Sequence, residues 1–309
     1  RGLGQSKRTI TTLRLSNMEG TRMGDWPTLI QDHLKCLTNL TYLGLGDMNL
    51  GDTGATTLAT LYLPMATGLS TLMLQNNKIG HHGGKSVATA MMYLPKLGKL
   101  NISLNFIGPA AAGDIIDSLA SKTTMTTLCM TSVKMRGDPA HNLEMRPLPE
   151  SILSVDMALN GLGGITQGED IRATGKITLL TCLGRCRQLA CLCLDNNGLG
   201  DAEITQLLTC LLIHLPLRLL DLSGNALSPR IQEPLSQALS EITTLHTLFM
   251  ADNFLGSEGA TKLLQQWPPT CRVHTFVINS NDITDNTVEH IQAWFHRTPA
   301  ITDVRLQGN

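Results

Sequence analysis

The chain has 309 residues, 42% hydrophobic and only 4% aromatic, so a core for one to three domains must be built mainly from aliphatic side chains. Its formal net charge of −1 argues against a general nucleic-acid binder, which needs clustered lysine and arginine. The longest apolar stretch, LLTCLLIHLPLRLL, is too short and too polar to span a bilayer, so we expect no membrane insertion.

One motif recurs along the whole sequence. The template L-x-x-L-x-L-x-x-N-x-L fits eleven segments, spaced by 27 to 30 residues except for one interval of 37. With the first leucine of the template counted as position 1, the repeats begin at Ile10, Leu40, Leu69, Leu97, Met125, Ile152, Leu189, Leu217, Leu245, Val273 and Ile301. A period held this closely predicts a solenoid.

Each repeat predicts a strand, a turn and a helix in that order. Positions 4 and 6 are apolar between polar neighbours, as in a strand with one buried face. Later apolar residues, such as Ile204, Leu207 and Leu208, follow a helical period, and prolines such as Pro216 end the helices. Strands stack about 4.8 Å apart whereas helices need roughly 8–10 Å. We therefore expect a right-handed α/β solenoid with parallel strands on its concave face and helices on its convex face.

Asparagine recurs at position 9, where the chain turns after each strand. A buried asparagine there can satisfy backbone groups of its own turn and of a neighbouring repeat. Met18, Met48 and Val133 interrupt the series. The predicted structural ladder consists of Asn77, Asn105, Asn160, Asn197, Asn225, Asn253 and Asn281.

The motif and its 28-residue helical period resemble the leucine-rich repeat family, ribonuclease-inhibitor-like class. The resemblance covers nearly the whole chain, and it implies a cytoplasmic horseshoe that binds other proteins. The repeat domains of Ran GTPase-activating protein and of NLR immune sensors have the same pattern. The motif alone does not choose among these proteins.

We expect a single domain over residues 1–309, made of about eleven repeats and interrupted at residues 133–176. The long repeat that begins at Ile152 carries nine extra residues, in a polar segment over residues 163–176. This insertion is either a tolerated surface loop or a binding loop with Gln167, Glu169, Asp170 and Arg172. Neither end shows a polar cap, so we expect a longer chain or ends that a partner covers.

Three short motifs suggest chemistry that the repeat pattern explains better. GHHGGKS, at residues 80–86, lacks one residue of a nucleotide-binding P-loop, and equivalent slots read GDTGATT and GSEGATK. Cysteines 182, 186, 191 and 193 fall on opposite sides of the predicted layer, so they predict no metal site. The RGD tripeptide at residues 136–138 is expected to be a turn. No cofactor is predicted.

The predicted concave face gathers acidic residues between the sixth and ninth repeats. Asp156, Asp195, Asp221 and Asp252 accumulate there with only Arg218 of opposite charge, and His246 and Phe249 lie beside them. This patch predicts a protein partner with a basic surface and an aromatic anchor at Phe249. Alternatively, the aspartates bond neighbouring serine, threonine or asparagine side chains.

The sequence therefore favours a non-catalytic scaffold, with no catalytic residue, that binds a folded protein. Three alternatives stay open: a GTPase-activating protein of the Ran type, the sensor repeats of an NLR-like protein, and a structural subunit of a ciliary or cytoskeletal assembly. Scattered cysteines fit a reducing, cytoplasmic location, which includes the cytoskeleton or the cilium.

Overall fold

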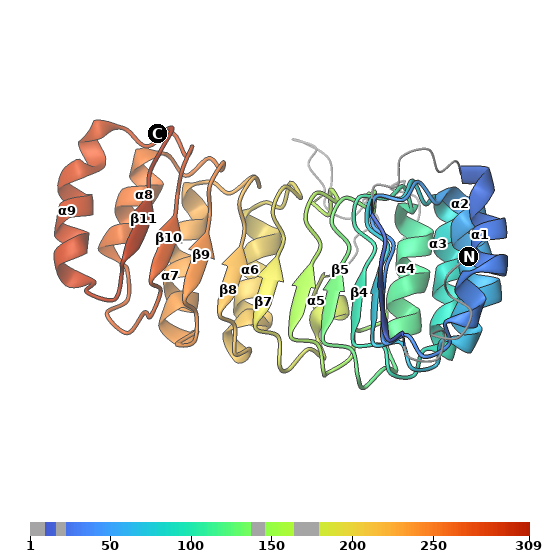
Figure 1. Ribbon diagram of the computed structural model, residues 1–309. Helices are drawn as coiled ribbons and strands as arrows, with labels where there is room; N and C mark the ends of the chain where they lie inside the picture. Colours follow the sequence, from blue (N-terminus) through green and yellow to red (C-terminus); the bar gives the residue numbers. More distant parts are fainter. Residues whose placement is uncertain (1–9, 17–22, 137–145, 164–178) are drawn as a thin grey trace. The chain divides into compact units, whose positions relative to one another are not determined.

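The computed structural model describes residues 10–16, 23–136, 146–163 and 179–309 (Figure 1). The chain forms two compact units, Arg1–Ile152 and Leu153–Asn309. Both units consist of the same strand–turn–helix repeat.

The first unit holds five short parallel strands that pair in chain order. Equivalent repeat positions face one another, so that Leu43 of position 4 lies beside Leu13 on one side and Leu72 on the other. The strands are β1 (Thr12–Arg14), β2 (Tyr42–Gly44), β3 (Thr71–Met73), β4 (Lys99–Asn101) and β5 (Thr127–Cys129).

Helices of the first unit follow the strands and cover one face of the sheet (Figure 1). The α-helices are α1 (Trp26–Asp32), α2 (Gly51–Thr57), α3 (His81–Ala90) and α4 (Gly108–Leu119). Short turns of tighter or wider helix complete them: η2 (Met23–Asp25), η3 (Leu34–Cys36), η4 (Leu58–Tyr62), η5 (Leu63–Met65) and η6 (Met91–Tyr93).

The second unit repeats this arrangement with six strands, again parallel and in chain order. They are β6 (Ser154–Asp156), β7 (Cys191–Cys193), β8 (Leu219–Asp221), β9 (Thr247–Phe249), β10 (Thr275–Val277) and β11 (Asp303–Arg305). The helical segments are α5 (Leu179–Leu183), α6 (Asp201–Cys210), η7 (Leu212–His214), η8 (Pro229–Ile231), α7 (Gln232–Glu241), α8 (Gly256–Gln265), η9 (Asp285–Thr287) and α9 (Val288–Arg297). The predicted α/β fold with parallel strands in chain order is confirmed.

The core of each unit lies between the sheet and its helices. Leucines at positions 4 and 6, such as Leu43 and Leu45, are completely buried because they point from the strands toward the helices. The opposite face of each sheet carries positions 3 and 5, and we call it the strand face. Most of its side chains stay partly accessible or exposed, whereas Gly44 and Val277 are buried.

The turn after every described strand from β2 onward has the same backbone. Its position-8 residue has a positive φ between 50° and 71°, the left-handed region that favours glycine, asparagine and aspartate. Most repeats place such residues there, but two place leucine, at Leu104 and Leu159 (both φ 57°). The position-8 residues are Asp47, Asn76, Leu104, Ser132, Leu159, Asn196, Gly224, Asp252, Ser280 and Gly308.

The expected interruption at residues 133–176 is only partly described. Residues 146–153 contain no helix, and the expected single-domain organisation over 1–309 remains an expectation beside the two compact units. Gln167, Glu169, Asp170 and Arg172 lie outside the described residues, as does the end of the RGD tripeptide. Within the described ranges no helix has the length and apolar character needed to cross a membrane.

Candidate functional site

Buried asparagines fix the turns from which the strand face is built. Asn105 Oδ1 accepts hydrogen bonds from the backbone N–H groups of Asn77 and Ile79 in the preceding repeat, both at 3.0 Å. Its Nδ2 donates to backbone carbonyls of both repeats, including Leu74 and Ile102. One side chain thus satisfies five backbone groups that would otherwise be buried without partners. The same pattern recurs, completely or in part, at Asn77, Asn160, Asn197, Asn225, Asn253 and Asn281.

Position 5 forms a continuous row across the strand face of the second unit. Strand register places Asp156 beside Cys193, Cys193 beside Asp221, and Asp221 beside Phe249. Neighbouring parallel strands lie about 4.8 Å apart, so these four side chains form one surface. Val277 then continues the row.

The carboxylates of this row act on one another and on the thiol between them. Burial first, and then the negative charges of Asp156, Asp221 and Asp195, together raise the pKa of the Cys193 thiol to about 12. Burial also raises the pKa of Asp221, helped by Asp195 and Asp156, against hydrogen bonds from Ser223 that lower it. The three aspartates therefore share one local field. We call Asp156, Cys193, Asp195 and Asp221 the acidic cluster.

Local hydrogen bonds stabilise two carboxylates of the acidic cluster, but no ion pair among the described residues neutralises their charge. Asp221 Oδ1 accepts from the Ser223 N–H at 2.9 Å, and Asp195 Oδ2 accepts from Asn196 Nδ2 at 3.0 Å. Among the described residues, the ion pairs are Lys85–Asp114, Lys262–Glu258 and Arg305–Asp303, and none includes the cluster. The surface of the acidic cluster therefore keeps a net negative charge, which a positively charged group of another molecule can complement.

The other predicted residues of the patch lie around the acidic cluster and not within it. Phe249 is half-buried beside Asp221. His246 lies before strand β9, where its ring stacks on His274 with centroids 5.1 Å apart. Asp252 is exposed in the turn at the other end of the same strand. The structure thus joins Asp156, Asp195, Asp221 and Phe249, with His246 and Asp252 at opposite ends.

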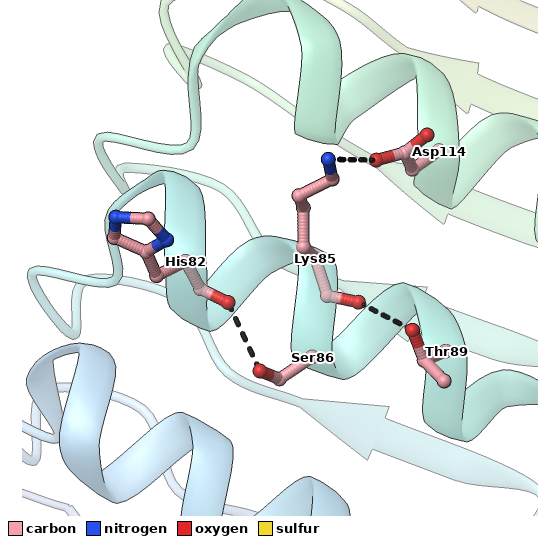
Figure 2. A network of polar contacts seen from close by, with 5 residues as sticks. All are labelled: His82, Lys85, Ser86, Thr89 and Asp114. Carbon is pink, nitrogen blue, oxygen red and sulfur yellow. Dashed lines mark hydrogen bonds and ion pairs between the residues drawn. The ribbon is translucent and has the colours of Figure 1, made fainter.

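The helix N-terminus that resembles a P-loop is already occupied by a protein carboxylate. Asp52 Oδ1, from the preceding repeat, accepts from the backbone N–H groups of Gly80 and Gly83 at 2.7 and 2.9 Å. Figure 2 shows that Lys85 of α3 points to Asp114 of α4, with 3.8 Å between Nζ and Oδ2. The groups that would hold a phosphate are therefore engaged in helix capping and an ion pair.

The sequence also resembles known proteins over most or all of its length. It is 25% identical over 310 residues to a ribonuclease inhibitor of Sus scrofa, covering 100% of this chain and 60% of that protein. The chain is thus similar in sequence to leucine-rich repeat proteins of the ribonuclease-inhibitor-like class. It is also 28% identical over 265 residues to the human NACHT, LRR and PYD domains-containing protein 2, covering 84% of this chain and 24% of that protein. The chain thus spans less than two thirds of either relative.

Two further comparisons complete this picture. No family model matches the chain. An internalin of Listeria monocytogenes superposes with a TM-score of 0.49 and 14% identity, covering 96% of this chain and 87% of its own. A leucine-rich repeat protein of Leptospira interrogans gives 0.49 and 17% identity, with 88% and 68% covered.

Sequence reasoning missed two features of this surface. Cys193 lies between two carboxylates because it shares position 5 with Asp156 and Asp221, and that shared position was the available signal. The stacking of His246 on His274 follows from their shared position 2. Within the described residues no three histidine, cysteine or acidic side chains are grouped to hold a metal ion.

Proposed function

We propose that the protein is a non-catalytic scaffold that binds a folded protein through the strand face of its second unit. The observation that carries the proposal is the register row Asp156–Cys193–Asp221–Phe249, which combines shared negative charge with a neighbouring aromatic ring. A basic partner surface complements this charge, and Phe249 supplies an anchor beside it.

The backbone supports this proposal because it holds the row before any partner arrives. Each strand pairs with its neighbours, and buried asparagines such as Asn197 and Asn225 fix the turns that follow. Docking on a preorganised surface loses little conformational entropy, so modest contacts yield useful affinity.

The relatives suggest a first partner to test. One of them is named a ribonuclease inhibitor, so a purified ribonuclease is a defined folded probe. We expect the double substitution Asp195→Lys and Asp221→Lys to weaken binding at least tenfold in calorimetry, because like charges then face the partner's cations. Glu150→Lys with Glu241→Lys makes the same charge change at exposed sites elsewhere and leaves binding unchanged.

Where the ribonuclease does not bind, the same two variants define the partner by quantitative capture from the protein's source. Proteins lost with the strand-face variant and kept with the control variant are the partners of this face. Identical captures by both variants would contradict the proposal. Stimulation of GTP hydrolysis when the chain is added to small GTPases would contradict its non-catalytic character.

A further inference from the structure

Two turns of the molecule expose a phenylalanine at position 10. Phe106, in the first unit, is 61% exposed, and Phe254, in the second unit, is 63% exposed. Other described repeats place small or polar residues there: Asn49, Lys78, Lys134, Gly161, Gly198, Ala226 and Asp282. Rings this exposed offer apolar surface that another molecule can cover where further apolar or charged groups lie beside them.

The two phenylalanines are presented by the same backbone. The N–H of Phe106 donates to Ile79 of the preceding repeat at 2.7 Å, and that of Phe254 donates to Leu227 at 2.9 Å. Two residues later, Gly108 and Gly256 take positive φ values of 77° and 60°, which lets the chain enter the next helix. Each ring therefore stands in an ordered turn between the turns of the neighbouring repeats.

The residues around the two rings carry charges of opposite sign, and one opposed pair, Lys134 and Asp282, occupies the same repeat position. Edge A consists of Lys78, Leu104, Phe106 and Lys134. Edge B consists of their equivalents Ala226, Asp252, Phe254 and Asp282. The flanking lysines and aspartates are exposed, and no ion pair between described residues includes any of them.

Leu104 adds apolar surface to edge A at a conformational cost. It is 51% exposed and has a φ of 57°, a region that disfavours leucine. An exposed side chain and a left-handed backbone both disfavour leucine at this position. The stability of the isolated fold therefore does not explain why residue 104 is a leucine. Strain of this kind is common where a residue serves contact with another molecule.

We propose that edge A of one copy of the chain docks on edge B of a second copy. The apolar surfaces of Phe106 and Leu104 meet Phe254, while Lys78 and Lys134 meet Asp252 and Asp282 on the partner copy. A second copy is the occupant that supplies both the ring and the carboxylates that edge A needs. The contact joins two different surfaces, so one edge of each kind stays open unless the pair closes on itself.

Sedimentation velocity of the purified chain tests this contact. We expect the weight-average mass to rise with concentration between about 10 μM and about 1 mM, since edges of this size are at the small end of specific interfaces. The rise should weaken between about 50 mM and about 500 mM salt, because exposed charge pairs are screened. A monomer at every concentration in about 50 mM salt would overturn the proposal.

Charge substitutions that use residue types already found at each position give a sharper test. Lys78→Asp with Lys134→Asp makes edge A acidic, and Asp252→Asn with Asp282→Lys makes edge B basic. Each variant alone should stay monomeric, with association weakened about tenfold or more. Because each keeps one intact edge, a mixture of the two should associate again. Failure of the mixture to associate, with both variants folded by circular dichroism, would contradict the inference.

Two controls distinguish this contact from a general effect of net charge and from binding through the strand face. Lys35→Glu with Lys96→Glu changes the same net charge at exposed sites outside edge A and should leave association unchanged. The strand-face variant Asp195→Lys with Asp221→Lys should also still self-associate, so the fates of the two proposals are separate. A monomeric chain that instead sediments with phosphatidylserine vesicles through Lys78 and Lys134 would assign edge A to membranes and overturn the proposal.

Discussion

The backbone N–H of Asn77 donates to the side-chain Oδ1 of Asn105 at 3.0 Å, so the turn of one repeat is held by a side chain of the next. The Asn105 side chain bonds five backbone groups in all, and it is buried. We expect Asn105→Ala to lower the free energy of unfolding by about 2–4 kcal/mol, because several buried polar groups lose their partners.

Urea unfolding followed by circular dichroism measures this effect. Asn101→Ala is the matched control, because Asn101 is half-buried and its Oδ1 accepts only from the nearby Ser103 N–H at 3.0 Å. It should cost about 1 kcal/mol or less. If both variants lost the same free energy of unfolding, the hydrogen bonds between repeats would stabilise the fold no more than a single local hydrogen bond does.

Helices are also capped between repeats, by Asp52 at the start of α3. Its Oδ1 accepts from Gly80 and Gly83, and its charge lies at the positive end of the helix dipole. Asp52→Ala should lower the free energy of unfolding by about 1–2 kcal/mol. Asp114→Ala removes only the exposed 3.8 Å pair with Lys85 (Figure 2) and should change it by less than about 0.5 kcal/mol. Similar losses in urea titrations of the two variants would exclude the capping role.

The fold was predictable because its physics repeats along the chain. A period of two at positions 4 and 6, followed by a helical period, leaves few alternatives to stacked strand–helix units. The helix caps were harder to predict from the sequence. Their signal is a short polar side chain at position 13, as at Asp52, Asp201 and Ser257. Each of these side chains accepts a hydrogen bond from the backbone N–H of position 12 in the next repeat. The division into two compact units falls at Ile152, where the single 37-residue interval of the period begins.

The candidate site was predictable in placement and less so in composition. Shared position 5 places Asp156, Asp221 and Phe249 on one face. Which charges act on one another depends on burial and strand pairing, so Cys193 was missed as a member of the cluster. Edges A and B were missed because they join positions 8 and 10 of different repeats, and Leu104 gives no sequence sign of its left-handed backbone.

The thiol of Cys193 reports the field of the acidic cluster. Because burial and then the neighbouring aspartates raise its pKa to about 12, little thiolate exists at pH 8.5, and iodoacetamide should label it slowly. Asp156→Asn with Asp221→Asn removes two negative charges, which lowers the Cys193 pKa and should speed labelling severalfold. Mass spectrometry of the labelled peptides follows this rate. Labelling of exposed Cys210 should not change, and an unchanged Cys193 rate would show that the aspartates do not act on it.

Asp221 should reduce stability at neutral pH. Its pKa in the folded state is raised, first by burial, so the folded chain holds that proton more tightly than the unfolded chain. Stability therefore falls as pH rises from the unfolded pKa through the raised folded pKa, and the loss is complete above it. Asp221→Asn keeps an acceptor for Ser223 and should be more stable than the wild type at pH 7. This gain should shrink as pH falls in urea titrations, and a gain independent of pH would contradict the assignment.

Leu159 is strained in the same way as Leu104, but it belongs to neither edge A nor edge B. It is 49% exposed and its φ is 57°, whereas equivalent positions hold Asn76 and Asn196. Asparagine tolerates this backbone, so Leu159→Asn should raise the free energy of unfolding by about 0.5–1 kcal/mol. Leu153→Asn, at a similarly exposed leucine with an ordinary backbone, should bring no gain.

Because left-handed strain is local, Leu104→Asn should stabilise the fold as much as Leu159→Asn does. Leu104→Asn should also weaken self-association, whereas Leu159→Asn should leave it intact. Urea titration of these three variants measures the cost of the left-handed backbone, and sedimentation measures self-association. Together they show whether the strained leucine at position 104 contributes to self-association and the one at position 159 does not.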